Sequence, residues 1–148
     1  MRPHMLLTFL LHTGLRKGET VRLVTNHLAL DDPEQPHLYV RYADKRHHHK
    51  ERKVNLAPDW VQDYRKYTER YQITERVFPW SVRLLEYHLE DVSITGRLKK
   101  HISFEMLRWT CALRDFRYGL EPEKLRRKLG LSKVQWGETR RKIRRLLE

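Results

Sequence analysis

The sequence predicts one α+β domain that is mainly helical and holds a small three-stranded antiparallel sheet. Hydrophobic residues follow a two-residue period only between residues 27 and 56, and from residue 58 onward they follow a helical period. The chain has 148 residues, of which 39% are hydrophobic, including four Trp and seven Tyr. That length and composition suit a single packed core. We therefore expect one domain over residues 1–148.

The N-terminal part predicts two helices, Met5–His12 and Leu15–Leu23, separated by a break at Thr13 and Gly14. Three short strands should follow, with a polar turn after the first and a basic, histidine-rich loop after the second. In chain order these segments are His27–Leu30, Asp31–Pro36, Leu38–Tyr42, Ala43–Glu51 and Arg52–Leu56.

The remaining chain predicts five helices, because a helix-starting residue precedes each helical run. Proline fits the first turn of a helix, and a serine side chain can bind the free N–H groups there. The expected helices begin at Pro58, after Ser81, after Ser103, at Pro122 and after Ser132. They end near Tyr71, Val92, Gly119, Gly130 and Leu147.

Positive charge is the dominant feature of the composition. Lys and Arg number 31 against 19 Asp and Glu, giving a net charge of +12. Such an excess favours a polyanion, most often nucleic acid. No predicted helix joins a wide aromatic face to a basic one, so we expect no membrane partner. The single cysteine, Cys111, cannot form an internal disulfide. We expect a cytoplasmic protein, associated with the nucleoid in a prokaryote.

The segment from Thr13 to Glu19 is the first candidate site. An arginine after a glycine break, at the start of a helix, can bind a phosphate with two parallel hydrogen bonds. Arg16 holds that position, and Glu19 lies one turn later, where its carboxylate can orient the guanidinium. The alternative is an ordinary surface ion pair between the two residues.

This segment, Thr-Gly-Leu-Arg-Lys-Gly-Glu after an apolar helix, resembles the first arginine box of tyrosine recombinases, the phage integrase family. The resemblance implies the fold of the family's catalytic domain, with Arg16 on the phosphate that is cut. It also implies a lysine in the following β-hairpin. Lys45 matches that lysine, and Lys50 is the alternative because the loop is extended by Arg46 and three histidines.

The second arginine box of the family matches Arg108, but Glu105 stands at the histidine position. The family's later histidine or tryptophan corresponds to Leu131, and the nucleophilic tyrosine corresponds to Arg140. A protonated guanidinium has no free lone pair and cannot attack phosphorus. The resemblance thus implies a degenerate pocket that holds DNA without cutting it. We expect Glu105 to pair with Arg16 or Arg108.

The expected partner is double-stranded DNA, with a second copy or a partner recombinase as a further possibility. We expect no cofactor, no metal and no small-molecule substrate. His47–His49 are adjacent loop residues, and three neighbouring imidazoles rarely converge on one ion. We expect no counterpart of the family's N-terminal DNA-binding domain within residues 1–148. The predicted phosphate-binding residues are Arg16, Lys45, Arg46, Lys50, Arg52, Arg108, Arg140 and Arg141.

Two alternatives remain open. The chain could be an active recombinase that uses a tyrosine from another protomer, or Tyr118, Ser132 or a water molecule as the nucleophile, although we expect Tyr118 near the core. It could instead be a basic module for RNA or for an acidic protein, in which case the two boxes are coincidental. Of the tryptophans, we expect core positions for all but Trp109, which neighbours Arg108.

Overall fold

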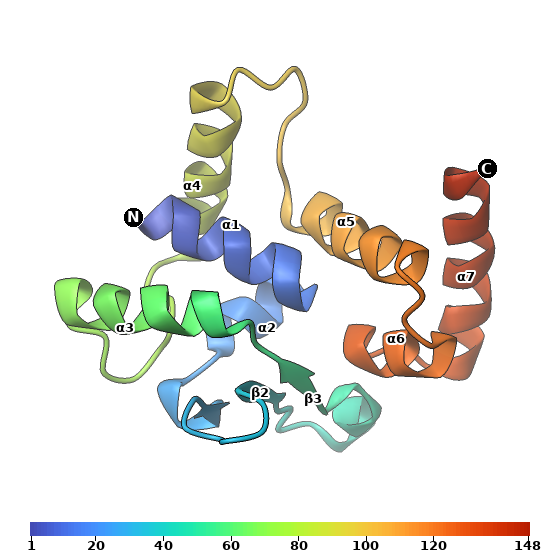
Figure 1. The fold of residues 1–148 in the computed structure, drawn as a ribbon, viewed down its shortest axis with the longest axis horizontal. Helices are drawn as coiled ribbons and strands as arrows, with labels where there is room; N and C mark the ends of the chain where they lie inside the picture. The colour runs from blue at the N-terminus through green and yellow to red at the C-terminus, as the bar shows by residue number, and fades with distance from the viewer.

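The computed structural model describes residues 1–148 (Figure 1). The order of elements is the predicted one: two helices, a three-stranded antiparallel sheet, then five helices. This confirms the predicted fold class. The elements are α1 (Arg2–Thr13), α2 (Lys17–Arg22), η1 (Thr25–His27), β1 (Leu28–Ala29), β2 (His37–Val40), η2 (Lys45–Lys50), β3 (Arg52–Asn55), α3 (Pro58–Tyr71), α4 (Val82–Thr95), α5 (Phe104–Arg117), α6 (Pro122–Leu129) and α7 (Lys133–Leu147).

The helix ends follow from local sequence. The side chains of Ser81, Ser103 and Ser132 accept hydrogen bonds from backbone N–H groups in the first turns of α4, α5 and α7. α1 and α6 end at Gly14 and Gly130, which adopt left-handed backbone angles with φ of 64° and 67°. Glycine adopts this conformation without a steric cost, so the chain reverses direction at both positions.

The sheet has the order β1-β2-β3, and Leu38 lies opposite Val54 in its register. The predicted histidine-rich loop joins β2 to β3, and it contains the 3-10 helix η2. Its first turn is stabilised by Asp44, whose carboxylate accepts a hydrogen bond from the backbone N–H of Arg46. The basic and histidine side chains of this segment therefore have defined positions.

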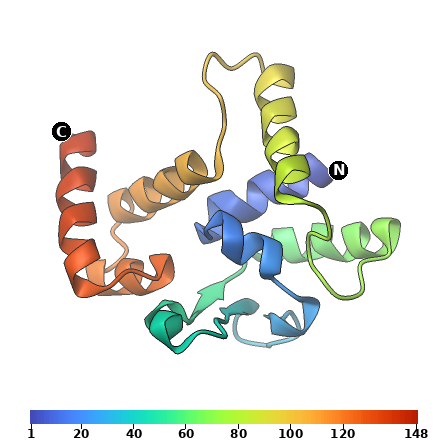
Figure 2. The same ribbon diagram turned by 180° about the vertical axis from the view of Figure 1, so that it is seen from behind.

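The buried residues form two separate clusters. The larger one has 21 residues from α1 to the start of α5, and Phe9 on α1 lies at its centre, 5.3 Å from the ring centroids of both Trp60 and Phe78. The smaller one has five residues from α5, α6 and α7. Figures 1 and 2 show α6 and α7 at one side of the molecule, away from α3 and α4. The helix α5 connects the two parts.

Candidate functional site

The glycine break after α1 positions Arg16. Gly14 turns the chain so that Arg16 becomes the N-cap residue of α2. The backbone N–H of Arg16 donates to Glu19 Oε1 at 2.9 Å, and its Nη1 donates to Glu19 Oε2 at 3.2 Å. The carboxylate thus holds both the backbone and the side chain of Arg16, the contact that their spacing predicts.

Glu19 is buried and organises more than one cation. Both terminal nitrogens of Arg52 donate to its carboxylate, at 2.7 and 2.9 Å, and the hydroxyl of Tyr42 donates to it as well. Burial alone would raise the pKa of Glu19, but these hydrogen bonds and the charge of Arg52 outweigh burial and lower it to about 2. The carboxylate is therefore ionised at any physiological pH and fixes Arg16 and Arg52 together.

A third arginine, Arg108 on α5, binds backbone oxygens next to Arg16 and Arg52. Its Nη1 donates to the backbone oxygen of Gly14 at 2.6 Å, and its Nη2 donates to that of Leu129. Two other arginines bind the neighbouring carbonyls of the same turn: Arg52 donates to Lys128 O at 2.7 Å and Arg16 donates to Gly130 O at 3.1 Å. Three arginines thus bind three successive carbonyls at the end of α6, where the helix dipole is negative.

The cluster of Arg16, Arg52 and Arg108 contains one buried carboxylate, Glu19, so its positive charge is incompletely balanced. Burial, together with repulsion from Arg16 and Arg52, lowers the pKa of Arg108 to about 9. Arg108 therefore still carries its charge at neutral pH, in an environment that disfavours it. An anion placed here would relieve that repulsion.

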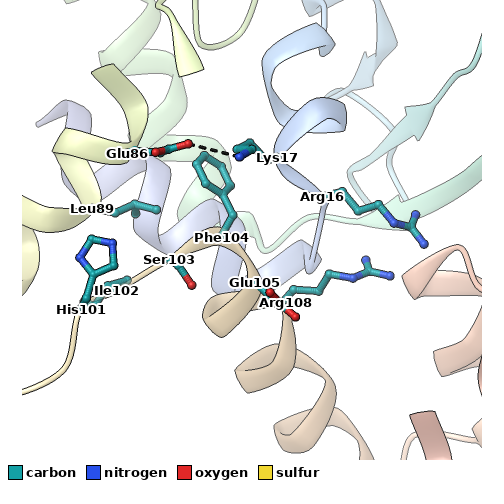
Figure 3. A pocket seen from close by; sticks show the side chains of 10 residues that line it. All are labelled: Arg16, Lys17, Glu86, Leu89, His101, Ile102, Ser103, Phe104, Glu105 and Arg108. Carbon is teal, nitrogen blue, oxygen red and sulfur yellow. Dashed lines mark hydrogen bonds and ion pairs between the residues drawn. The ribbon is translucent and has the colours of Figure 1, made fainter. Parts of the chain in front are cut away.

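Two cavities open at this cluster, of about 410 and 230 Å³, and both are lined by Arg16, Glu105 and Arg108. Figure 3 shows the larger one, with the guanidinium groups of Arg16 and Arg108 side by side and pointing in the same direction. His101 lies at the opposite end of this cavity in the same view. The arrangement offers paired guanidinium donors to an oxyanion that enters from solvent.

The two candidate hairpin lysines occupy different places. Lys50 lines a third cavity, of about 620 Å³, together with Arg16, and its Nζ lies 5.8 Å from the ring centroid of Tyr42. Lys45 is exposed at the start of η2 and lines none of the three cavities around Arg16. The 3-10 turn separates them, because it directs Lys45 outward and returns the chain to the site at Lys50. The structure brings Lys50, not Lys45, next to Arg16.

Two of the predicted phosphate-binding arginines are engaged with the protein itself. The side chain of Arg52 is only 5% exposed, and all of its nitrogens donate to Glu19, Lys50 O or Lys128 O. Contrary to the prediction, Arg52 lies beneath the surface as a support for the site. Arg46 is exposed and pairs at 2.8 Å with Asp44, which lines the third cavity, but Arg46 itself lines none of the cavities around Arg16.

The expected ion pair between Glu105 and Arg16 or Arg108 does not form, and that prediction was wrong. The nearest donors are already bound to Glu19 and to backbone carbonyls, and Glu105 lies exposed in the first turn of α5, where the helix dipole stabilises a carboxylate. Figure 3 marks no contact between its carboxylate and either guanidinium group. Leu131 is half-buried and lines the smaller cavity.

On α7, Arg140 is half-buried, and its Nε is buried without a hydrogen-bond partner, whereas Arg141 is exposed. Tyr118, which we expected near the core, is 84% exposed because α5 ends just before it. It lines none of the cavities around Arg16. Trp109 lines the smaller cavity, and Lys142 Nζ lies 4.9 Å from its ring centroid.

Sequence reasoning missed several residues that line these cavities. Thr139 lines the smaller one, Lys17 and His101 line the larger one, and Arg22 and Arg41 line the third. Lys17 could have been indicated by its place in the sequence, because it directly follows Arg16. Nothing in the local sequence distinguishes Thr139 or His101 from other polar residues. The packing of α7 against α5 brings Thr139 to the smaller cavity, and the segment before α5 places His101 at the far end of the larger one.

No group of three or more His, Cys, Asp and Glu side chains is arranged to hold a metal ion. None of the helices combines the length and the apolar character that crossing a membrane requires.

A comparison with solved structures finds similar folds among site-specific recombinases. The XerA recombinase superposes with a TM-score of 0.75 and 22% sequence identity over 90% of this chain and 48% of its own. The XerH recombinase bound to difH substrate, in a pre-cleavage complex, gives 0.77 and 15% over 94% and 41%. The Tn1549 transposon integrase in complex with transposon right end DNA gives 0.68 and 15% over 99% and 59%.

The present chain therefore spans about half the length of these proteins. No protein-family model matches the sequence, and no curated protein matches it. The likeness in structure nevertheless extends over at least nine tenths of this chain. The chain has the fold of a tyrosine recombinase catalytic domain.

Proposed function

We propose that this protein binds double-stranded DNA through its phosphate backbone and does not cleave the strand. The observation that carries the proposal is the convergence of Arg16 and Arg108 on shared cavities with positive charge left unbalanced. A backbone phosphate supplies the missing negative charge, and paired guanidinium groups match its oxygens. The net charge of +12 adds attraction at longer range.

The absence of cleavage rests on the tyrosines. Tyr42 is the one tyrosine that lines a cavity together with Arg16, and its hydroxyl is bound to Glu19. Burial, with the neighbouring carboxylate, raises the pKa of Tyr42 above its usual value. The phenol therefore stays protonated, and a protonated phenol is a weak nucleophile. No tyrosine lines the two cavities that Arg16 shares with Arg108.

Duplex binding can be measured at several salt concentrations for the protein and for Arg16→Ala and Arg108→Ala. Each substitution should weaken binding and reduce the slope of log affinity against log salt by about one unit. Arg65→Ala is the matched control, since Arg65 is exposed, pairs with Asp31 and lines neither of these cavities. Equal slopes for all four proteins would contradict the proposal, and so would a clear preference for structured RNA over duplex DNA.

Cleavage is tested with a nicked duplex that traps a covalent protein–DNA intermediate. We expect no adduct with the purified chain. An adduct would contradict the non-cleaving part of the proposal and leave the DNA-binding part intact. Mass spectrometry of the digested adduct would then identify the attacking residue.

A further inference from the structure

The threonines in the helices differ in whether their side-chain hydroxyl makes a hydrogen bond. A helical threonine usually binds its hydroxyl to a backbone carbonyl one turn earlier. The hydroxyls of Thr8, Thr13, Thr20, Thr68 and Thr110 all do so.

Two helical threonines do not make this bond. Thr95 is the exposed last residue of α4, so water satisfies its hydroxyl. Thr139 lies within α7 and is half-buried, and none of the hydrogen bonds of the structure involves its hydroxyl. It is also not among the buried polar atoms that lack a partner, so its oxygen remains accessible. Thr139 therefore holds an unused donor in a partly enclosed place.

The place is the smaller cavity, of about 230 Å³, which Thr139 lines together with Arg16 and Arg108. The three side chains come from three elements that are far apart in the chain: the start of α2, the first half of α5 and the middle of α7. The remaining lining is Glu105 and four largely apolar side chains, those of Trp109, Ala112, Leu129 and Leu131. In this cavity the Thr139 hydroxyl makes no hydrogen bond to a protein acceptor.

We propose that Thr139 donates a hydrogen bond to an oxygen of the phosphate that Arg16 and Arg108 hold. This inference rests on the proposed function and adds a neutral donor from α7 to the two cations. A hydroxyl bound to a charged oxygen contributes more than one bound to a neutral group, and apolar surroundings strengthen it. The hydrogen bond from Thr139 makes α7 part of the phosphate site and not only a basic surface.

The test is duplex DNA binding by Thr139→Val and Thr139→Ser. Valine keeps the shape of threonine and removes the hydroxyl, so affinity should fall about ten-fold. Serine keeps the hydroxyl and should restore most of it. Because the hydroxyl is neutral, the salt slope should be the same for all three proteins, whereas Arg16→Ala lowers it.

Thr110→Val is the matched control: it is the same change at an exposed threonine of α5 whose hydroxyl is already bound to Met106 O. It should leave DNA affinity unchanged. The melting temperature of each variant shows whether a loss of binding reflects unfolding. If the parent protein binds duplex DNA and Arg16→Ala weakens it, but Thr139→Val binds normally, only the role of Thr139 is overturned. If the parent protein does not bind duplex DNA, the proposed function itself fails.

Discussion

The two parts of the molecule are held together in different ways. The larger part, from α1 to the start of α5, has an apolar core of 21 buried residues with a continuous group of aromatic rings. The part formed by α6, α7 and the second half of α5 has only five buried core residues. The free energy that apolar burial contributes scales with the buried area, so the second part gains much less from it.

Arginine contacts compensate at the boundary between the two parts. Arg16, Arg52 and Arg108 belong to the larger part and donate to the backbone oxygens of residues 128–130 at the end of α6. Two of these arginines, Arg16 and Arg108, also line the cavities that we assign to a phosphate. The comparison teaches that Arg16 and Arg108 both attach the smaller part and line the site, so stability and DNA affinity should be coupled at this boundary.

The sharpest contrast should come from removing one core side chain in each part. Phe9→Ala should reduce the free energy of unfolding by about 4 kcal/mol, because it leaves a cavity among aromatic rings in the larger core. Ile143→Ala removes a fully buried side chain of α7 and should mainly loosen α6 and α7. Hydrogen exchange measures both effects. Equal loss of protection in α1 and α7 for Ile143→Ala would show that the two parts are one cooperative unit.

Glu19→Gln should be the next largest change. It leaves the buried Arg52 without its counter-charge, and the pKa of Glu19, lowered to about 2 from 4.5, corresponds to a stability of ~3 kcal/mol at neutral pH. A lowered carboxyl pKa stabilises the fold above the unfolded value and loses this contribution as pH falls towards the folded value. Denaturant unfolding should therefore show a difference between the two proteins that is constant above pH 5 and shrinks towards pH 2. A difference independent of pH would rule out this role.

Gly130→Ala should cost about 2 kcal/mol, from a left-handed backbone and from a clash. The added Cβ would lie 2.6 Å from Arg52 Nη1 and 3.0 Å from Arg16 Nη1. Gly119→Ala is the control, since its φ is also positive at 88° but the added atom meets nothing within 4 Å. Both variants should lose stability, and only Gly130→Ala should also lose duplex affinity. Equal DNA affinity for the two variants would show that the arginine contacts at the end of α6 do not influence the phosphate site.

The smallest effect should come from the two hairpin lysines. Lys50→Ala should weaken duplex binding several-fold and reduce the salt slope by about one unit, because Lys50 shares a cavity with Arg16. Lys45→Ala should change binding less, since Lys45 lies outside that cavity. Titrations at low salt would detect the difference. A larger loss for Lys45 would mean that η2 rearranges when DNA binds.

The sequence alone predicted the order of elements and the fold class. Serine caps, prolines in first turns and the two glycine stops act through residues a few positions away, so they can be identified without knowing the fold. The contact between Arg16 and Glu19 has the same local origin, a spacing of one helical turn. The resemblance that named Arg16 and Arg108 also came from short motifs.

Only the tertiary structure decided which oxygens each arginine binds. Arg52 was expected at a phosphate but lies buried between Glu19 and Lys128 O, and Glu105 was expected at an arginine but faces solvent. Lys50 replaces Lys45 at the site because of a 3-10 turn, and the free hydroxyl of Thr139 is visible only once α7 lies beside Arg108. The physical reason is that a long side chain can reach several acceptors, which only folding brings together from distant parts of the chain. The residues near it in the sequence therefore do not determine which acceptor it binds.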